Sequence, residues 1–327
     1  MLPSCIPFAL FFARVLRRQL MSYDGSVIPL RHRCAVLAAV FFLAPVFPSK
    51  SLAQLQHAVD QAFRTPAGTI VVVDVDSGRL LASKNLDLAA KRLVRPGSTL
   101  KPFVLQELLR TNRIDPGRRL LCKRPLRIGA SHLDCSHAPE IKQLNAADAL
   151  AYSCNSYVAE VSTRLNSQQL AEALRRVGLD SPTGLVEAEG VGHIDRAANR
   201  EQLQLLALGL RGIEVTPLEL LQAYRKLAVQ RPRAKALGIE AIYNGLENAV
   251  AYGTAHAAFV PSLKVAGKTG TASSAQIAVT HGLFVGYAPA EHPEIAIVVY
   301  LEHGRGLDAA AIAQSVLAQY KPLEKTP

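Results

Sequence analysis

Apolar, β-branched segments at both ends of the chain enclose a long helical middle, and this arrangement limits the fold more than any other feature. Residues 69–75 and 79–83 are joined by the turn residues Asp76-Ser77-Gly78, which predicts a hairpin. Residues 282–287 and 295–301 predict two more strands far downstream. We therefore expect one sheet lobe that is assembled from both ends of the chain.

The segments between these strands carry apolar residues at helical spacing. The predicted helices cover residues 103–109, 146–152, 157–165, 169–177, 202–208 and 217–228. Two further helices are expected, before the first strand over residues 55–63 and at the C-terminus over residues 308–320. The fold class is thus α+β, with a helical lobe over about residues 93–235 inserted into a sheet lobe formed by about residues 54–92 and 236–327.

The N-terminal segment, residues 1–53, is predicted to be an export leader. Two arginines precede an apolar run over residues 34–47, and Ser51-Leu52-Ala53 supplies the small residues that a signal peptidase requires. We expect cleavage after Ala53 and a periplasmic or cell-envelope location. Met21 is an alternative start, and a retained membrane anchor is the alternative to cleavage.

Composition narrows the classes of function. A chain of 327 residues with 49% hydrophobic residues can bury one sizeable core or two packed lobes. Its formal net charge of +11 suits an anionic neighbourhood such as cell-wall polymer, acidic lipid or nucleic acid. Because Trp is absent and aromatic residues make up only 6%, no base-stacking platform and no nucleic-acid partner are expected.

Three cysteines follow the predicted leader. In an exported chain, the simplest reading of Cys122 and Cys135 is a disulfide, which contributes about 3 kcal/mol in the chain-entropy model. The alternative is a metal site, since His132 and His137 flank Cys135, although the spacing fits no familiar zinc pattern. Cys154 is expected to be unpaired and buried, and no cofactor is expected.

The string Ser98-Thr99-Leu100-Lys101 follows Pro96-Gly97, which turns the chain into a helix. Lys101 stands three residues after Ser98 and therefore on the same helix face. The helix N-terminus favours a serine alkoxide and disfavours a nearby cation, so Ser98 is the candidate nucleophile and Lys101 its base. The alternative is an ordinary serine N-cap with a solvated lysine.

A second polar string, Ser153-Cys154-Asn155, separates two predicted helices. The first of these helices is capped by Asn145. Such a triplet is placed to project into a cleft. Ser153 is expected to pass a proton between Lys101 and a leaving amine, and the Asn155 amide to hold the backbone of an acyl donor. The alternative is an ordinary turn between helices.

The third string, Lys268-Thr269-Gly270-Thr271, is expected on an edge strand. Gly270 would let a substrate backbone approach, Lys268 would supply positive charge, and the hydroxyls of Thr269 and Thr271 would bind a carboxylate. The backbone amides of Ser98 and Thr271 are the candidate oxyanion hole. The alternative is a surface turn that begins a strand.

In this order the three strings resemble the S-x-x-K, S-x-N and K-T-G motifs of penicillin-binding protein transpeptidase domains. The resemblance runs from about Thr69 to the C-terminal helix. It implies a five-stranded antiparallel sheet with helices on both faces, plus a helical subdomain. Further supporting strings are Arg95-Pro96-Gly97-Ser98-Thr99-Leu100-Lys101-Pro102, Val215-Thr216-Pro217-Leu218-Glu219-Leu220, Gly253-Thr254-Ala255, Ala266-Gly267-Lys268-Thr269-Gly270-Thr271-Ala272 and Phe284-Val285-Gly286-Tyr287-Ala288-Pro289.

The resemblance also implies an activity: acylation of Ser98 by a peptidoglycan stem peptide ending in D-Ala-D-Ala, with β-lactams as substrate mimics. The chain would then be a D,D-transpeptidase or D,D-carboxypeptidase. Cell-wall synthesis proteins would be its partners, and a membrane would be contacted only through an uncleaved leader. Too few residues precede Gln54 for the additional domains of large family members, so the chain resembles a stand-alone module.

Two alternatives remain open at this point. Class A β-lactamases share the three motifs and use a loop glutamate, usually in E-x-x-L-N, to activate the deacylating water. Glu187 and Glu189 lie between the second and third motifs, but without that string. The other alternative is a non-catalytic module, either a cell-wall scaffold or a β-lactam sensor.

Overall fold

The computed structural model describes residues 50–63, 67–273 and 280–321. The predicted leader up to residue 49, with Met21 and the apolar run, lies outside the described residues. Helix α3 (Lys50–Ala62) begins before the predicted cleavage position after Ala53. In the part of the chain that the structure describes, no helix has the length and apolar character needed to cross a bilayer.

The sheet is assembled from both ends of the chain, as the sequence predicts. Each neighbouring pair of strands is antiparallel, and β1 pairs directly with β11, with Val71 opposite Val298. The strand order is β2 (Leu80–Lys84), β1 (Gly68–Asp74), β11 (Ile295–Leu301), β10 (Thr280–Ala288) and β9 (Ala266–Ser273). Strand β9, which carries Lys268-Thr269-Gly270, is therefore an edge strand.

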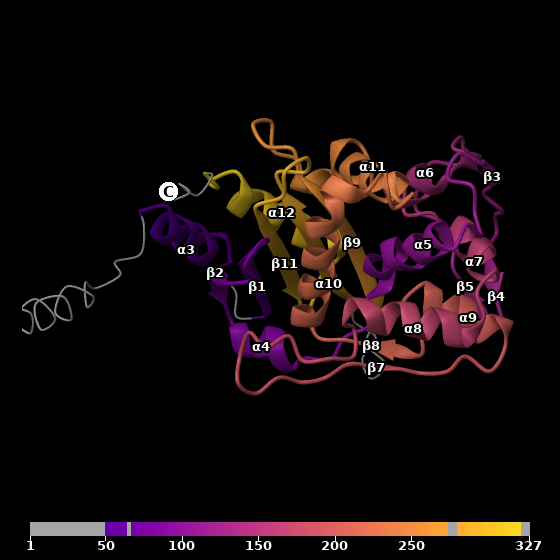
Figure 1. Cartoon of the computed structure of the whole chain (residues 1–327), viewed down its shortest axis with the longest axis horizontal. Coiled ribbons are helices and arrows are strands. Elements are labelled where there is room, and N and C mark those ends of the chain that lie inside the picture. The colour runs from indigo at the N-terminus through magenta and orange to yellow at the C-terminus, as the bar shows by residue number, and fades with distance from the viewer. Residues whose placement is uncertain (1–49, 64–66, 274–279, 322–327) are drawn as a thin grey trace, which may run out of the picture. The chain divides into compact units, whose positions relative to one another are not determined.

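Helices cover both faces of the sheet (Figure 1). Alternate residues of β1 point to opposite faces, so Ile70 packs with α3 and α12 (Gly306–Leu317), whereas Val71 joins the core shared with the helical middle. Because both faces are covered, β11 reads as the continuous apolar run IAIVVYL. The expected five-stranded sheet between helices is confirmed.

The face of the sheet opposite α3 and α12 is covered mainly by α10 (Pro217–Gln230), which contacts both β10 and β11. We expected this helix in the inserted lobe, but it belongs equally to the layer on the sheet. Short α4 (Leu86–Lys91) packs beside it against β1. The sequence pattern did not predict α4, whose six residues are too few for a clear helical period.

The helical lobe lies to the right of the sheet in Figure 1 and surrounds the largely buried α5. Its helices are α5 (Lys101–Arg110), α6 (Ala146–Ala151), α7 (Asn155–Ser162), α8 (Ser167–Val177) and α9 (Arg200–Ala207). A further helix that the sequence did not predict, α11 (Glu240–Ala251), contacts both α6 and β9 and so joins the two lobes. Single turns of 3-10 helix are η1 (Gly97–Leu100), η2 (Arg231–Arg233) and η3 (His256–Ala258).

Three two-stranded ribbons complete the described structure. They pair β3 (Leu120–Leu121) with β6 (Gln143–Leu144), β4 (Arg127–Ile128) with β5 (Ser131–His132), and β7 (His193–Ile194) with β8 (Ile213–Glu214). All six strands have only two residues, so these ribbons shape loops and do not extend the sheet.

The buried carboxylate of Glu219 holds three chain segments together at the start of α10. Its Oε2 accepts from the backbone of Thr216 at 2.6 Å, and its Oε1 accepts from Gly192 at 2.9 Å and Ser181 at 3.1 Å. The Thr216 hydroxyl in turn accepts a hydrogen bond from the Glu219 backbone amide at 3.1 Å, which completes a capping box. One side chain thus satisfies three backbone donors.

We expect Glu219→Gln to lower the free energy of unfolding by about 2 kcal/mol, because the amide NH₂ group replaces one acceptor and faces a backbone N–H. Glu172→Gln is the matched control, since Glu172 is exposed on α8 and accepts a hydrogen bond from the Gln168 side chain. The control should shift stability by less than about 0.5 kcal/mol. Urea unfolding of both variants provides the comparison, and equal midpoints would contradict this role for Glu219.

Candidate active site

Ser98 lies in η1, one turn of 3-10 helix that precedes α5 and does not belong to that helix. Residues three apart eclipse one another in a 3-10 turn, so Ser98 and Lys101 still share a face as predicted. The turn is fixed by its neighbours: the Tyr224 hydroxyl donates to the Thr99 carbonyl at 2.8 Å, and the Gly97 amide donates to the Gly209 carbonyl at 3.0 Å.

Lys101, the first residue of α5, is completely buried. Its Nζ donates to the Asn155 Oδ1 at 2.6 Å, to the Ser153 carbonyl at 2.7 Å and to the Ser153 hydroxyl at 3.2 Å. Motifs one and two are therefore joined through one amine. Among the described residues, the hydrogen bonds of this amine go to motif two and not to Ser98.

Burial lowers the pKa of Lys101 from its usual value to about 8, although the nearby thiols of Cys154 and Cys135 oppose this shift. From the sequence we attributed a reactive lysine to the helix N-terminus. The structure gives a different main cause, which is the loss of water around the amine. A substantial fraction of Lys101 is thus neutral near physiological pH and able to accept a proton.

The second motif forms the sharp turn between α6 and α7. Ser153 adopts a left-handed backbone with φ 54°, which is uncommon for a residue other than glycine. Asn145 caps α6 as predicted, in a capping box with Asp148. The turn directs both the carbonyl and the hydroxyl of Ser153 toward Lys101.

Asn155 is held on both sides of its amide. Its Oδ1 accepts from Lys101, and its Nδ2 donates to the Leu133 carbonyl at 3.0 Å. We expected this amide to bind the backbone of an acyl donor. In the structure it positions Lys101 and anchors the loop that contains Leu133.

The third motif reaches the second through Thr254, a residue to which the sequence analysis gave no role. Lys268 donates to the Thr254 hydroxyl at 3.3 Å, and the Thr254 amide donates to the Ala151 carbonyl at the end of α6 at 3.0 Å. The only sequence signal was the string Gly253-Thr254-Ala255, which supported the family resemblance. Thr254 therefore links the edge strand to the helix that precedes motif two.

Lys268 is also completely buried, and this burial, together with the charge of Lys101, lowers the pKa of Lys268 well below its usual value. We expected Lys268 to supply positive charge. In the structure its ammonium form would be repelled by that of Lys101, because both amines are buried. An anionic group that entered beside Lys268 would restore its charge.

Gly270 serves the chain itself. A Cβ at this position would lie 2.7 Å from the Pro96 carbonyl oxygen and 3.0 Å from the Thr99 Cγ2, so glycine lets the Ser98 turn pack directly on β9. From the sequence we expected this freedom to let a substrate backbone approach. The structure shows that motif one occupies the space on the Cβ side.

The two threonine hydroxyls of the motif are engaged within the chain. Thr269 donates to the Thr254 carbonyl at 3.3 Å, and Thr271 accepts from the amide of Gly306, the first residue of α12, at 2.9 Å. We expected both hydroxyls to bind a substrate carboxylate. In this structure they fix β9 against its neighbours, while the Thr271 hydroxyl proton remains available for donation.

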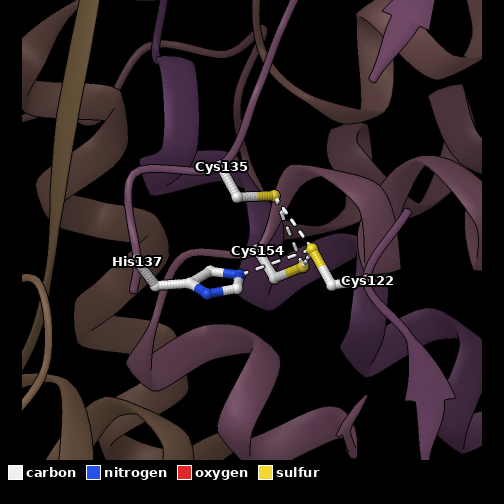
Figure 2. Close-up of side chains that lie close together, drawn as sticks. All are labelled: Cys122, Cys135, His137 and Cys154. Carbon is white, nitrogen blue, oxygen red and sulfur yellow. Dashed lines mark hydrogen bonds between the residues drawn. The ribbon is translucent and has the colours of Figure 1, made fainter. Parts of the chain in front are cut away.

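The cysteine of motif two, Cys154, lies beside Cys122 and Cys135 (Figure 2). The predicted disulfide is not formed in the structure: the sulfurs of Cys122 and Cys135 are 3.6 Å apart and all three described cysteines are free. A disulfide bond requires about 2.05 Å. Cys154 is buried, as predicted, and its sulfur lies 3.6 Å from each of the other two.

Comparison with known proteins places this geometry in a family. The family model of the penicillin-binding protein transpeptidase domain matches residues 68–319. This chain belongs to that family. The resemblance based on the three motifs is thereby confirmed, and the match covers both the sheet and the helical lobe.

Relatives of this transpeptidase-family chain include curated proteins from several bacteria. It is 26% identical to stage V sporulation protein D of Bacillus subtilis (strain 168) over 261 residues, which cover 68% of this chain and 40% of that protein. It is 24% identical to a probable peptidoglycan D,D-transpeptidase PenA of Neisseria meningitidis over 296 residues, 76% of this chain and 49% of the relative. Peptidoglycan D,D-transpeptidase MrdA of Acinetobacter baumannii is 44% identical over 79 residues, 20% of this chain and 12% of that protein. The chain spans half or less of the length of these relatives.

A solved structure shows the same fold. The crystal structure of a peptidoglycan glycosyltransferase from Burkholderia ambifaria superposes with a TM-score of 0.71 at 20% sequence identity, and the match covers 82% of this chain and 92% of the other. At this identity the comparison supports the fold of the transpeptidase domain and nothing further.

Neither glutamate considered for a β-lactamase resembles a deacylating base in this family member. Glu189 accepts hydrogen bonds from the backbone of Thr183, Leu185 and Val186, so its carboxylate is engaged in its own loop. Burial raises the pKa of Glu189, but the hydrogen bonds outweigh it and the net pKa is lowered. Glu187 is exposed. Neither glutamate therefore has the unengaged, buried carboxylate of a deacylating base.

Proposed function

We propose that this chain is a serine acyltransferase that cleaves peptidoglycan stem peptides ending in D-Ala-D-Ala through an acyl-enzyme on Ser98. The observation that carries the proposal is the buried Lys101 amine, which has a pKa of about 8 and is held by three hydrogen bonds to motif two. A buried amine near neutrality is the state that a general base requires.

The proposed reaction begins with proton transfer from the Ser98 hydroxyl to neutral Lys101. The serine oxygen attacks the carbonyl of the penultimate D-Ala, and the backbone amides of Ser98 and Thr271 stabilise the resulting oxyanion. Ser153, 3.2 Å from Lys101, relays the proton to the nitrogen of the leaving D-Ala as the peptide bond breaks. An amine of a second stem peptide then takes the acyl group, in a transpeptidase, or water takes it, in a carboxypeptidase.

Positive groups around the edge strand suit the carboxylates of such a substrate. Lys268 lies close enough to Lys101 for their charges to interact. Arg95 and Arg211 line a hollow of about 260 Å³ beside the end of β9 at Ala272 and Ser273. A substrate carboxylate beside Lys268 would favour its ammonium form. β-Lactams, as mimics of the D-Ala-D-Ala end, would acylate the same serine.

We also propose that the chain is exported and works at the cell wall, in the periplasm or envelope. The support is the predicted leader and the similarity to relatives that include peptidoglycan D,D-transpeptidases. Peptidoglycan stem peptides are its proposed substrate, and cell-wall synthesis proteins are its proposed partners.

The rate at which a penicillin acylates Ser98 is expected to fall about tenfold per pH unit below pH 8 and to level off above it. The rate falls toward low pH because only the neutral amine of Lys101 accepts the serine proton. This neutral form is lost as the pH falls through the lowered pKa of about 8. Lys268 on β9 and the thiols of Cys135 and Cys154 also face Lys101 and move the midpoint. Acylation rates of a fluorescent penicillin across this range test the profile, and a flat profile would contradict the role of Lys101.

Product analysis tests the choice of substrate. The full chain is incubated with a disaccharide pentapeptide ending in D-Ala-D-Ala, with and without an added amine acceptor, and free D-Ala is measured. Release of D-Ala with a cross-linked product supports a transpeptidase, and release with a shortened peptide supports a carboxypeptidase. Absence of D-Ala release would refute the proposed substrate.

A further inference from the structure

The thiol of motif two, two further thiols and a histidine lie close together (Figure 2). The sulfurs of Cys122, Cys135 and Cys154 form an equal-sided triangle with 3.6 Å edges. The Nε2 of His137 lies 3.6 Å from the Cys122 sulfur, and all four ligand atoms lie within 4.8 Å of one another. Four soft or borderline donors this close together are a set that a metal ion can bind.

We propose that Cys122, Cys135, His137 and Cys154 form a tetrahedral Cys₃His site for Zn²⁺ that holds motif two in position against Lys101. Zinc–sulfur bonds of about 2.3 Å in a tetrahedron place two sulfurs about 3.8 Å apart. Zinc–nitrogen bonds of about 2.0 Å place a sulfur and a nitrogen about 3.5 Å apart. The three sulfur–sulfur separations and the separation of Nε2 from the Cys122 sulfur therefore need to change by only a few tenths of an ångström. The other two sulfur–nitrogen separations lie within 4.8 Å.

The surrounding backbone is suited to thiolates. The Cys154 sulfur accepts from the Tyr157 amide at 3.4 Å, and the Cys135 sulfur accepts from the Ser156 amide at 3.5 Å. Both amides belong to the first turn of α7, where the helix N-terminus favours negative charge. A neutral thiol needs no such support.

A carbonyl near His137 suits the tautomer that a metal requires. A metal on Nε2 requires the ring proton on Nδ1, and the Ala138 carbonyl lies 3.1 Å from Nδ1, in reach to accept it. The Arg124 Nη2 lies 2.7 Å from Nδ1 and 3.3 Å from Nε2, so this donor must turn away from the ring when a metal binds. It also donates to the His137 carbonyl at 2.6 Å. Once Nδ1 carries the proton, Arg124 keeps the carbonyl bond and its charge offsets the single negative charge of a zinc ion with three thiolates.

The segment that supplies three of the ligands lacks a core of its own. Between β3 and β6, only Ile128, Cys135 and His137 are buried, and the strands have two residues each. Small segments without a hydrophobic core commonly depend on a metal or a disulfide. A zinc ion would attach this segment to α7, and thus provide the link that the predicted disulfide cannot provide to Cys154.

Cys154 connects the proposed metal to the reaction, because it is the middle residue of Ser153-Cys154-Asn155. Its two neighbours supply all three hydrogen-bond acceptors of the Lys101 amine. The loop with Cys135 is also fixed by the bond from Asn155 to the Leu133 carbonyl. Metal loading therefore fixes the positions of Ser153 and Asn155. This positioning effect rests on the proposed function, whereas metal binding does not.

Metal content of the purified full chain tests the binding. We expect stoichiometric zinc that survives desalting, and replacement by Co²⁺ should give the intense charge-transfer and d–d bands of thiolate ligands in a tetrahedron. Cys122→Ser and His137→Gln should lower zinc affinity at least tenfold. His132→Gln is the matched control, because the exposed His132 is paired with Asp134 and lies outside the cluster.

The site would be refuted if the purified chain held no zinc while its thiols were free. A Cys122–Cys135 disulfide found by peptide mapping without reduction would refute it as well. If a cysteine variant fails to fold, the cobalt spectrum of the unaltered chain still decides the ligands. A spectrum without thiolate bands would also refute the site.

Removal of the zinc under reducing conditions tests the positioning. We expect penicillin acylation to slow about tenfold or more and to recover when zinc is returned. Equal rates with and without zinc would refute the positioning role. A zinc-loaded chain that never forms an acyl-enzyme would instead refute the proposed function and leave the metal site intact.

Discussion

Lys101→Met is expected to slow acylation of Ser98 by a penicillin about a thousandfold. Methionine fills a similar volume, but it cannot accept the serine proton. The loss would also remove the amine that joins the turn at Ser98 to Ser153 and Asn155. The measurement is the second-order rate of covalent labelling.

Lys101→Arg tests whether Lys101 acts as a base or only as a positive charge. Arginine keeps the positive charge but does not lose its proton in proteins, so the base assignment predicts a loss as large as that of methionine. Lys226→Met is the matched control, since burial also lowers the pKa of Lys226, which donates to the Val177 carbonyl away from the motifs. Near-normal labelling by the arginine variant would show that Lys101 acts only through its charge.

Asn155→Asp is expected to slow acylation about 100-fold at neutral pH and to restore much of the rate at higher pH. The substitution places a carboxylate where Oδ1 now lies 2.6 Å from the Lys101 amine. A neighbouring negative charge favours the ammonium form, so it raises the pKa of Lys101 and leaves less neutral base. The pH–rate profile of penicillin labelling should therefore move upward.

Asn155→Ala is expected to shift the pH–rate profile in the opposite direction. It removes an acceptor of the ammonium form, so the profile should move downward in pH while the rate falls for lack of positioning. Asn166→Asp is the control, because Asn166 caps α8 by accepting from the Gln169 amide and aspartate caps equally well. If both substitutions at Asn155 left the midpoint unchanged, Asn155 would not act through Lys101.

The sheet and most helices could be predicted from the sequence because their burial leaves a periodic pattern. Strand β11 is covered on both faces and is continuously apolar, and α10 begins with Thr216 and Pro217. Helix α11 was missed. Its Gly245 is unfavourable for a helix, yet a Cβ there would lie 2.7 Å from the Leu150 Cβ, so glycine allows α6 and α11 to pack closely.

The motifs predicted which residues form the candidate site. They did not predict the burial and contacts of its lysines. Neither the burial of Lys101 nor the contact from Lys268 to Thr254 depends on local spacing, because both arise where distant segments meet. The cysteines show the same limit. Cys122 and Cys135 are close in sequence and suggested a pair, whereas the fold brings Cys154 from the turn before α7 to an equal distance.

The most direct test of the account is intact-mass spectrometry of the full chain after a brief exposure to penicillin, compared with Ser98→Ala and followed over hours. The account predicts a stable gain equal to the mass of the antibiotic on the unaltered chain and none on the variant. An equal adduct on Ser98→Ala, or no adduct on either chain, would contradict the assignment of Ser98. An adduct that forms and disappears while the antibiotic is hydrolysed would identify a β-lactamase instead.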